Sequence, residues 1–207
     1  WALALKNKTK EVEKVVIGEG ITKIGQNNFD NTYSDWPNLK EVDLASTVTT
    51  IGNASFCDVA ALQTINLNDV EKIEQGGLAG TGIEQAVFDK EQVEIGGSAF
   101  ESCTNLKSVS VKDIINWGDA SFSGCRSLTT FLCEKPIERC VALSTCAITG
   151  VKKVGASAFA SCASLTSFDF SNVTILNGMA FQGAGLTKVA FTTKDLTLAY
   201  GVLDCEN

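Results

Sequence analysis

Residues 98–111 read SAFESCTNLKSVSV and residues 120–131 read ASFSGCRSLTTF, so one motif returns after 22 residues. The phenylalanine position of this motif recurs along almost the whole chain. A mostly aliphatic column upstream of it and a leucine or isoleucine column downstream of it keep the same spacing. The phenylalanine column consists of Phe29, Phe56, Leu78, Phe100, Phe122, Phe159, Phe181 and Leu203. Three columns in one register indicate an array of structural repeats.

Each repeat contains a short strand after the downstream leucine. Apolar residues alternate there, as in Leu106, Val109 and Val111, which predicts a strand with one side facing inward. A second extended piece precedes the upstream Ile-Gly pair. The A-F-x-x-C segment between them is too short for a helix, and we expect one helical or 3₁₀ turn. The glycine of the pair, such as Gly52, suits a corner that needs a positive φ or no Cβ.

A 22-residue unit cannot bury its own apolar side, so neighbouring units must stack. Stacking places equivalent strands about 4.8 Å apart in a parallel ladder. We therefore expect a single domain over residues 1–207 with about eight coils. Irregular insertions are expected at about residues 30–37 and 134–149, and the third repeat is one residue short before Ile83. The last coil ends before its own strand, so we expect it to be incomplete.

The repeats resemble the BspA-like (Treponema pallidum-type) leucine-rich repeat family. The resemblance rests on VVIGEGITKIG (residues 15–25), on SAFASCASLTSFDF (157–170) and on the two stretches quoted above, and it covers about residues 12–205. It implies a leucine-rich-repeat solenoid, a right-handed, β-rich α/β superhelix with a parallel sheet on its concave face. It also implies a secreted or cell-surface protein of host-associated bacteria or of some protozoa, with a role in adhesion.

The composition excludes several kinds of site. The chain has no histidine, which rules out Ser-His-Asp and Cys-His catalytic groups and histidine metal ligands. Its net charge of −7 argues against nucleic acid and anionic membranes as partners. No run of 18 apolar residues predicts a transmembrane helix. We therefore expect no enzymatic activity, no cofactor and no membrane insertion. The chain opens at Trp1 without a signal peptide, so we expect the targeting segment to lie outside it.

The cysteines fall into two groups. Cys103, Cys125 and Cys162 share one repeat column. We expect free thiols there, because parallel side chains at this spacing rarely reach disulfide geometry. Cys140 and Cys146 lie in the insertion, where a disulfide between them is one hypothesis. A zinc site is the alternative, although the spacing lacks the close cysteine pairs that metal sites use.

Alternation along the strands also predicts a row of outward side chains on which a partner could bind. The residues of this row that we expect to contact a partner are Asp43, Asn66, Ser110, Leu132 and Asp169. Tyr33 and Trp36, in the first insertion, are a second candidate, because such aromatic side chains are frequent interface anchors. The alternative for Trp36 is that it folds back to cover the first coils.

Two hypotheses for the function follow. The first is a non-enzymatic interaction module that binds a protein, of the host matrix or of a microbial surface, or a glycan, through the concave sheet. A rigid sheet suits this role, because little ordering entropy is lost on binding. The alternative is a structural spacer or stalk that presents another module and has no ligand of its own. Under both hypotheses, the resemblance implies that the protein lies outside the cell or on its surface.

Overall fold

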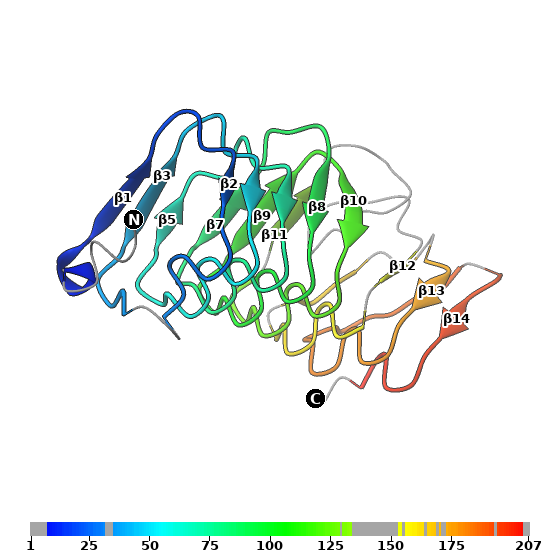
Figure 1. The fold of residues 1–207 in the computed structure, drawn as a ribbon. Helices are drawn as coiled ribbons and strands as arrows, with labels where there is room; N and C mark the ends of the chain where they lie inside the picture. The colour runs from blue at the N-terminus through cyan, green and yellow to red at the C-terminus, as the bar shows by residue number, and fades with distance from the viewer. Residues whose placement is uncertain are drawn as a thin grey trace.

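The chain winds into a column of stacked coils that runs from β1 at one end to β14 at the other (Figure 1). The computed structural model describes residues 8–31, 35–128, 130–133, 153–154, 156–163, 165–168, 170, 173–192 and 194–204. Every strand pair in these ranges is parallel, and their only helix is the short 3₁₀ helix η2 (Thr9–Glu11). The solenoid predicted from the repeat columns is therefore confirmed.

One set of strands follows the downstream leucine column, where the alternation predicted strands. We call this set the first face. Its strands are β1 (Lys14–Ile17), β3 (Glu41–Leu44), β5 (Thr64–Ile65), β7 (Gln85–Val87), β9 (Ser108–Val111) and β11 (Thr130–Cys133). Strands β1, β3 and β5 form one sheet, and β7, β9 and β11 form another. Equivalent residues pair in register, as Lys14 does with Glu41. Each outward side chain therefore lies beside its counterpart in the next coil.

The other set of strands ends at the upstream, mostly aliphatic column of each repeat, and we call it the second face. Strands β2 (Lys23–Ile24), β4 (Thr50–Ile51), β6 (Lys72–Ile73), β8 (Val93–Ile95) and β10 (Ile114–Trp117) form a five-stranded sheet. At the same repeat position, β12 (Lys153–Val154), β13 (Ile175–Leu176) and β14 (Thr197–Leu198) form a three-stranded sheet. Ile24 pairs with Ile51, and Ile51 pairs with Ile73, so the upstream column stacks inside the solenoid.

The turns around the phenylalanine column form a third ladder of hydrogen bonds. In each coil, three alternate residues donate their backbone N–H groups to carbonyls of the next coil. In the second coil the donors are Ala54, Phe56 and Asp58, and the acceptors are Gln75, Gly77 and Ala79. The same pattern joins Gly124 to Ala160, with an N···O distance of 2.7 Å. The coils before and after residues 134–150 are therefore stacked neighbours.

In the turns from that of Phe56 to that of Phe181, two positions have a left-handed backbone, one two residues before the phenylalanine position and one two residues after it. Around Phe100, φ is 54° at Ser98 and 59° at Ser102. These residues divide the segment into tight turns closed by local bonds, such as the 3.2 Å bond from the N–H of Cys103 to the carbonyl of Phe100. The predicted helical or 3₁₀ turn is therefore corrected to consecutive turns, because a left-handed residue cannot continue either helix.

The glycine of the Ile-Gly pair is selected by close approach between coils. A Cβ on Gly52 would lie 2.4 Å from the carbonyl oxygen of Ile24 in the preceding coil. A Cβ on Gly118 would lie 2.1 Å from the backbone nitrogen of Gly97. Neither glycine has a positive φ. Of the two alternatives considered for this column, the need for no Cβ is the correct one.

The phenylalanine column forms the centre of the core. Phe122 is fully buried, and its ring centroid lies 5.0 Å from that of Phe100 and 6.3 Å from that of Phe159. Phe181 continues the stack at 5.3 Å from Phe159. These rings are close to parallel, with interplanar angles between 6° and 18°. The ladder thus repeats one side-chain position in successive coils, and identical rings stack along the axis.

Candidate functional site

The first face presents the predicted outward row to solvent. On β3, Val42 and Leu44 are buried, whereas Glu41 and Asp43 are half-buried and face outward. On β7, Ala86 is buried between two exposed residues. The alternation read from the sequence therefore assigns the inward and outward positions of these strands correctly.

The first face is interrupted between β5 and β7, which belong to different sheets. The interruption coincides with the short repeat. Leu62 and Ile83 are 21 residues apart, whereas Ile83 and Leu106 are 23 residues apart. The missing residue shifts β7 relative to β5, so the two strands do not form a ladder.

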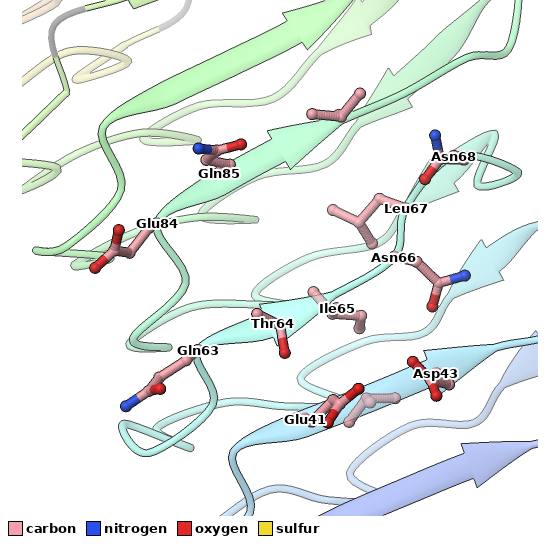
Figure 2. A pocket seen from close by; sticks show the side chains of 12 residues that line it. Glu41, Asp43, Gln63, Thr64, Ile65, Asn66, Leu67, Asn68, Glu84 and Gln85 are labelled. Atoms are coloured by element: carbon pink, nitrogen blue, oxygen red, sulfur yellow. The ribbon is translucent and has the colours of Figure 1, made fainter.

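A hollow of about 550 Å³ lies across this interruption (Figure 2). It is lined by the outward side of β3, by β5 with the residues around it, and by β7. The lining residues are Glu41, Val42, Asp43, Gln63, Thr64, Ile65, Asn66, Leu67, Asn68, Glu84, Gln85 and Val87. Figure 2 shows Thr64 on the middle strand, between Glu41 on β3 and Gln85 on β7.

The three carboxylates that line the hollow form ion pairs with lysines of neighbouring coils. Nζ of Lys14 lies 2.8 Å from Oε1 of Glu41 and 2.6 Å from Oδ2 of Asp43. Hydrogen bonds to Asp43 and then to Glu41 raise the pKa of the Lys14 ammonium group to about 12. Nζ of Lys107 lies 2.8 Å from Oε2 of Glu84. All these side chains are about half exposed, so the pairs position charge and each adds little to stability.

Asn66 replaces a peptide group in the ladder. Its Oδ1 accepts a 2.6 Å hydrogen bond from the N–H of Leu44, and its Nδ2 donates a 2.8 Å bond to the carbonyl of Leu44. The amide therefore satisfies the backbone at the end of β3. Asn66 lines the hollow as predicted for a surface residue, but it also has a structural role that the alternation pattern did not indicate.

The structure brings some of the predicted contact residues together. Asp43 and Asn66 line the hollow, whereas Ser110 lies outward on β9, one strand beyond it. Trp36 is in the core, 0% exposed, with its ring centroid 5.1 Å from that of Phe29. It cannot contact a partner, so its place as an interface anchor is corrected in favour of the alternative that it covers the first coils.

Other predicted residues fall where the structure gives no side chain. The backbone of Leu132 pairs with Ser110 on β9, but its side chain lies outside the described residues. Tyr33 and Asp169 lie outside them as well. So do Cys140 and Cys146, whose pairing stays a prediction.

Sequence reasoning missed six of the eight polar residues that line the hollow. Gln63 and Glu84 each precede a strand, Asn68 follows one, and the row beside the one chosen contains Glu41, Thr64 and Gln85. The signal that could have found them is the short spacing before Ile83, because a lost residue marks the place where the first face breaks.

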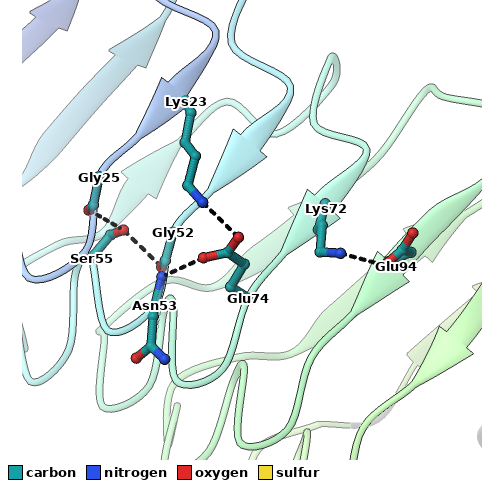
Figure 3. Close-up of polar contacts among 8 residues, drawn as sticks. All are labelled: Lys23, Gly25, Gly52, Asn53, Ser55, Lys72, Glu74 and Glu94. Atoms are coloured by element: carbon teal, nitrogen blue, oxygen red, sulfur yellow. Dashed lines mark hydrogen bonds and ion pairs between the residues drawn. The ribbon is translucent and has the colours of Figure 1, made fainter.

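Polar contacts on the second face tie coils together (Figure 3). Nζ of Lys23 lies 2.6 Å from Oε1 of Glu74, two coils away, and Oε2 of Glu74 accepts a 3.0 Å bond from the N–H of Asn53. The hydrogen bond from Lys23 is the main cause of a lowered pKa at Glu74. Lys72 and Glu94 form a further pair at 2.8 Å. These contacts stabilise the stack.

The cysteine column carries thiols as predicted. Cys103, Cys125 and Cys162 are buried and free. Burial raises the pKa of Cys103 to about 11 and that of Cys162 to about 12, and it raises the pKa of Cys125 well above its usual value. Such thiols carry almost no thiolate at neutral pH and are poor nucleophiles and metal ligands.

Metal sites and membrane-spanning helices are both absent from the described part of the chain. Within it, no group of three or more Cys, Asp or Glu side chains has an arrangement that could hold a metal ion. None of its helices has the length and apolar character needed to span a bilayer.

Comparisons with known proteins agree with this architecture. The model of the BspA type leucine-rich repeat region matches residues 30–139 and 131–200, with six copies of the repeat. No curated protein matches the chain. A solved structure of a leucine-rich repeat protein from Bacteroides ovatus is similar in fold, with 22% identity and a TM-score of 0.50. The similarity covers 93% of this chain but only 59% of that one.

A second solved structure, described as a leucine rich cell surface protein from Faecalibacterium prausnitzii, shares 15% identity with a TM-score of 0.32. It aligns over 91% of this chain and 69% of its own.

Proposed function

Because the chain belongs to the BspA type leucine-rich repeat family, we propose that it is a non-enzymatic binding module whose partner, a protein, contacts the first face. The observation that carries this proposal is the hollow across the interrupted first face. The hollow has a volume of about 550 Å³, and charged, amide and hydroxyl side chains line it. Protein recognition uses this mixture of area and scattered polar groups.

The architecture supports the proposal energetically. The outward side chains of the first face stand on hydrogen-bonded strands: β3 and β9 pair with a strand on each side, and β5 and β7 pair with a strand on one side. Their positions are therefore set before a partner arrives. A preorganised surface loses less conformational entropy on binding, so more of the contact energy appears as affinity.

We further propose that the protein is secreted or attached to the cell surface, and that it adheres to proteins of the host matrix or of microbial surfaces. Family membership supports this placement. The acidic chain, with its net charge of −7, suits partners with basic surfaces better than nucleic acid or anionic lipid.

A binding screen with one pair of variants tests the proposed function. The chain is passed over immobilised matrix proteins, mucin and whole bacterial cells, beside Ser110→Arg and Thr50→Arg. Each substitution places one arginine at an outward, half-buried hydroxyl residue on a strand with a neighbour on both sides, Ser110 on the first face and Thr50 on the second. Circular dichroism confirms that both variants remain folded.

We expect wild type and Thr50→Arg to bind with equal affinity and Ser110→Arg to bind at least about tenfold more weakly, because a bulky cation obstructs the contact surface. Equal loss in both variants, or in neither, would remove the first face from the proposal. No saturable binding by wild type would favour the spacer or stalk hypothesis instead.

A further inference from the structure

The charges of the hollow are unequal. Its lining contains the carboxylates of Glu41, Asp43 and Glu84 and no lysine or arginine. The lysines that pair with them lie outside the lining, and there are two of them for three carboxylates, because Glu41 and Asp43 share Lys14. The hollow therefore keeps negative charge at its surface even when Lys14 and Lys107 are both paired.

Neutral polar groups complete the floor of the hollow. The side chains of Gln63, Thr64 and Gln85 are exposed and make no hydrogen bond to another described residue. Two amides and a hydroxyl on neighbouring strands can both donate and accept, which is what the backbone of an extended chain requires. Val87, 40% exposed, adds an apolar edge at the far side.

The lining argues against other ligands. It contains no aromatic side chain, and so it offers no flat apolar surface against which a sugar ring could stack. Its carboxylates repel phosphate, which disfavours nucleic acid and phosphorylated ligands. A peptide segment with a cationic side chain fits both the charge and the hydrogen-bonding groups.

We propose that the hollow between β3, β5 and β7 binds an extended segment of the protein partner that carries a lysine or arginine, whose charged group lies among Glu41, Asp43 and Glu84. The inference rests on the proposed function and names the chemistry of the partner at that surface. Charge complementarity of this kind also speeds encounter and makes binding sensitive to salt.

The test uses three labelled peptides of glycine and serine that differ only in a central Lys-Lys, Gln-Gln or Glu-Glu pair. Each is titrated into the ¹⁵N-labelled chain at low and at high salt, and backbone amide shifts locate the binding. We expect the Lys-Lys peptide to shift the amides of residues 63–68 and 84–87. The Gln-Gln and Glu-Glu peptides should shift them little, and high salt should weaken the Lys-Lys complex.

Two matched variants distinguish binding in the hollow from non-specific attraction of a cationic peptide to an acidic protein. Glu84 and Glu94 each pair with a lysine of a neighbouring coil at 2.8 Å, one beside the hollow and one on the second face. Glu84→Gln should weaken binding of the Lys-Lys peptide about fivefold, which is the largest effect usually measured for one exposed ion pair. Glu94→Gln should leave the binding unchanged. Thr64→Lys, which places a cation in the hollow, should abolish it.

Equal weakening by Glu84→Gln and Glu94→Gln, or no preference among the three peptides, would overturn the inference. These outcomes differ from a failure of the proposed function. If Ser110→Arg abolishes binding to a surface protein while Glu84→Gln leaves that binding intact, the first face is the binding surface but the basic segment is wrong.

Discussion

At the scale of single residues, the three cysteines of the repeat column serve as small buried donors. The Sγ of Cys103 donates to the carbonyl of Leu78 at 3.1 Å, and Cys125 makes the same bond to Phe100 in the coil before it. Thr81 occupies the column one coil earlier, and its hydroxyl donates to the carbonyl of Leu78 at 2.8 Å. A buried carbonyl needs a donor, and a thiol supplies one with little polar surface.

The buried thiols should be protected from alkylation. With a pKa of about 11, roughly 0.1% of Cys103 is thiolate at pH 8. We expect iodoacetamide at pH 8 to leave Cys103, Cys125 and Cys162 unmodified in the native chain and to modify all three in urea. Peptide mapping by mass spectrometry reads each site. Native modification at the rate seen in urea would contradict the buried column.

Truncation of one stacked ring should be strongly destabilising. Phe122 is 0% exposed between two other rings, so Phe122→Ala should lower the free energy of unfolding by about 3–5 kcal/mol. Urea denaturation followed by circular dichroism measures the change. Tyr200→Ala is the control, because Tyr200 is 87% exposed and its truncation should change stability by less than about 0.5 kcal/mol. A loss below about 1 kcal/mol at Phe122 would mean that the column is misplaced.

At the scale of the elements, the strands could be predicted and the turns could not. Alternation around Val109 and Val111 fixes which side of β9 faces the core. The left-handed position two residues before the phenylalanine has no comparable sequence pattern. Its column includes Asn27 and Gly76, which tolerate positive φ, but also Ala54, Ser98 and Met179, which do not favour it. The ladder bonds to the next coil impose the conformation, and those partners are some 21 residues away.

Two glycine substitutions should separate backbone strain from steric clash. Gly76 has φ of 63°, and a Cβ there would have no neighbour closer than 4.0 Å, so Gly76→Ala should cost about 1 kcal/mol for the left-handed backbone alone. Gly52→Ala should destabilise more, because its Cβ would lie 2.4 Å from a backbone oxygen of the preceding coil. Urea midpoints of both variants give the order, and the reverse order would refute the assigned causes.

At the scale of the whole molecule, contacts between distant coils determine features that the sequence pattern does not predict. The pair of Lys23 and Glu74 joins residues 51 positions apart, so no local charge pattern reveals it. The burial of Trp36 beside Phe29 likewise depends on how the first insertion folds back. The short repeat before Ile83 locates the interruption of the first face, but the depth and charge of the hollow depend on side chains from three strands.

The ion pair between Lys23 and Glu74 predicts that the stability of the chain depends on pH. The pKa of Glu74 is lowered in the folded chain from 4.5, so its contribution to stability is complete above pH 4.5 and is lost as the pH falls through the folded value. We expect Glu74→Gln to be less stable than wild type at pH 7, and the difference to shrink toward pH 3. Thermal unfolding across this range measures both. A difference that stays constant with pH would exclude the ion pair as its cause.

The stacking of coils has a mechanical consequence. The backbone ladders join each coil to its immediate neighbours along the axis, so tension on the chain ends loads the ladders at the terminal coils first. A peeled coil of 22 residues lengthens the chain by roughly 70 Å, against about 5 Å that it occupied in the stack. Under load the molecule would therefore yield in steps, one coil at a time. Each step dissipates energy while the remaining coils keep their shape.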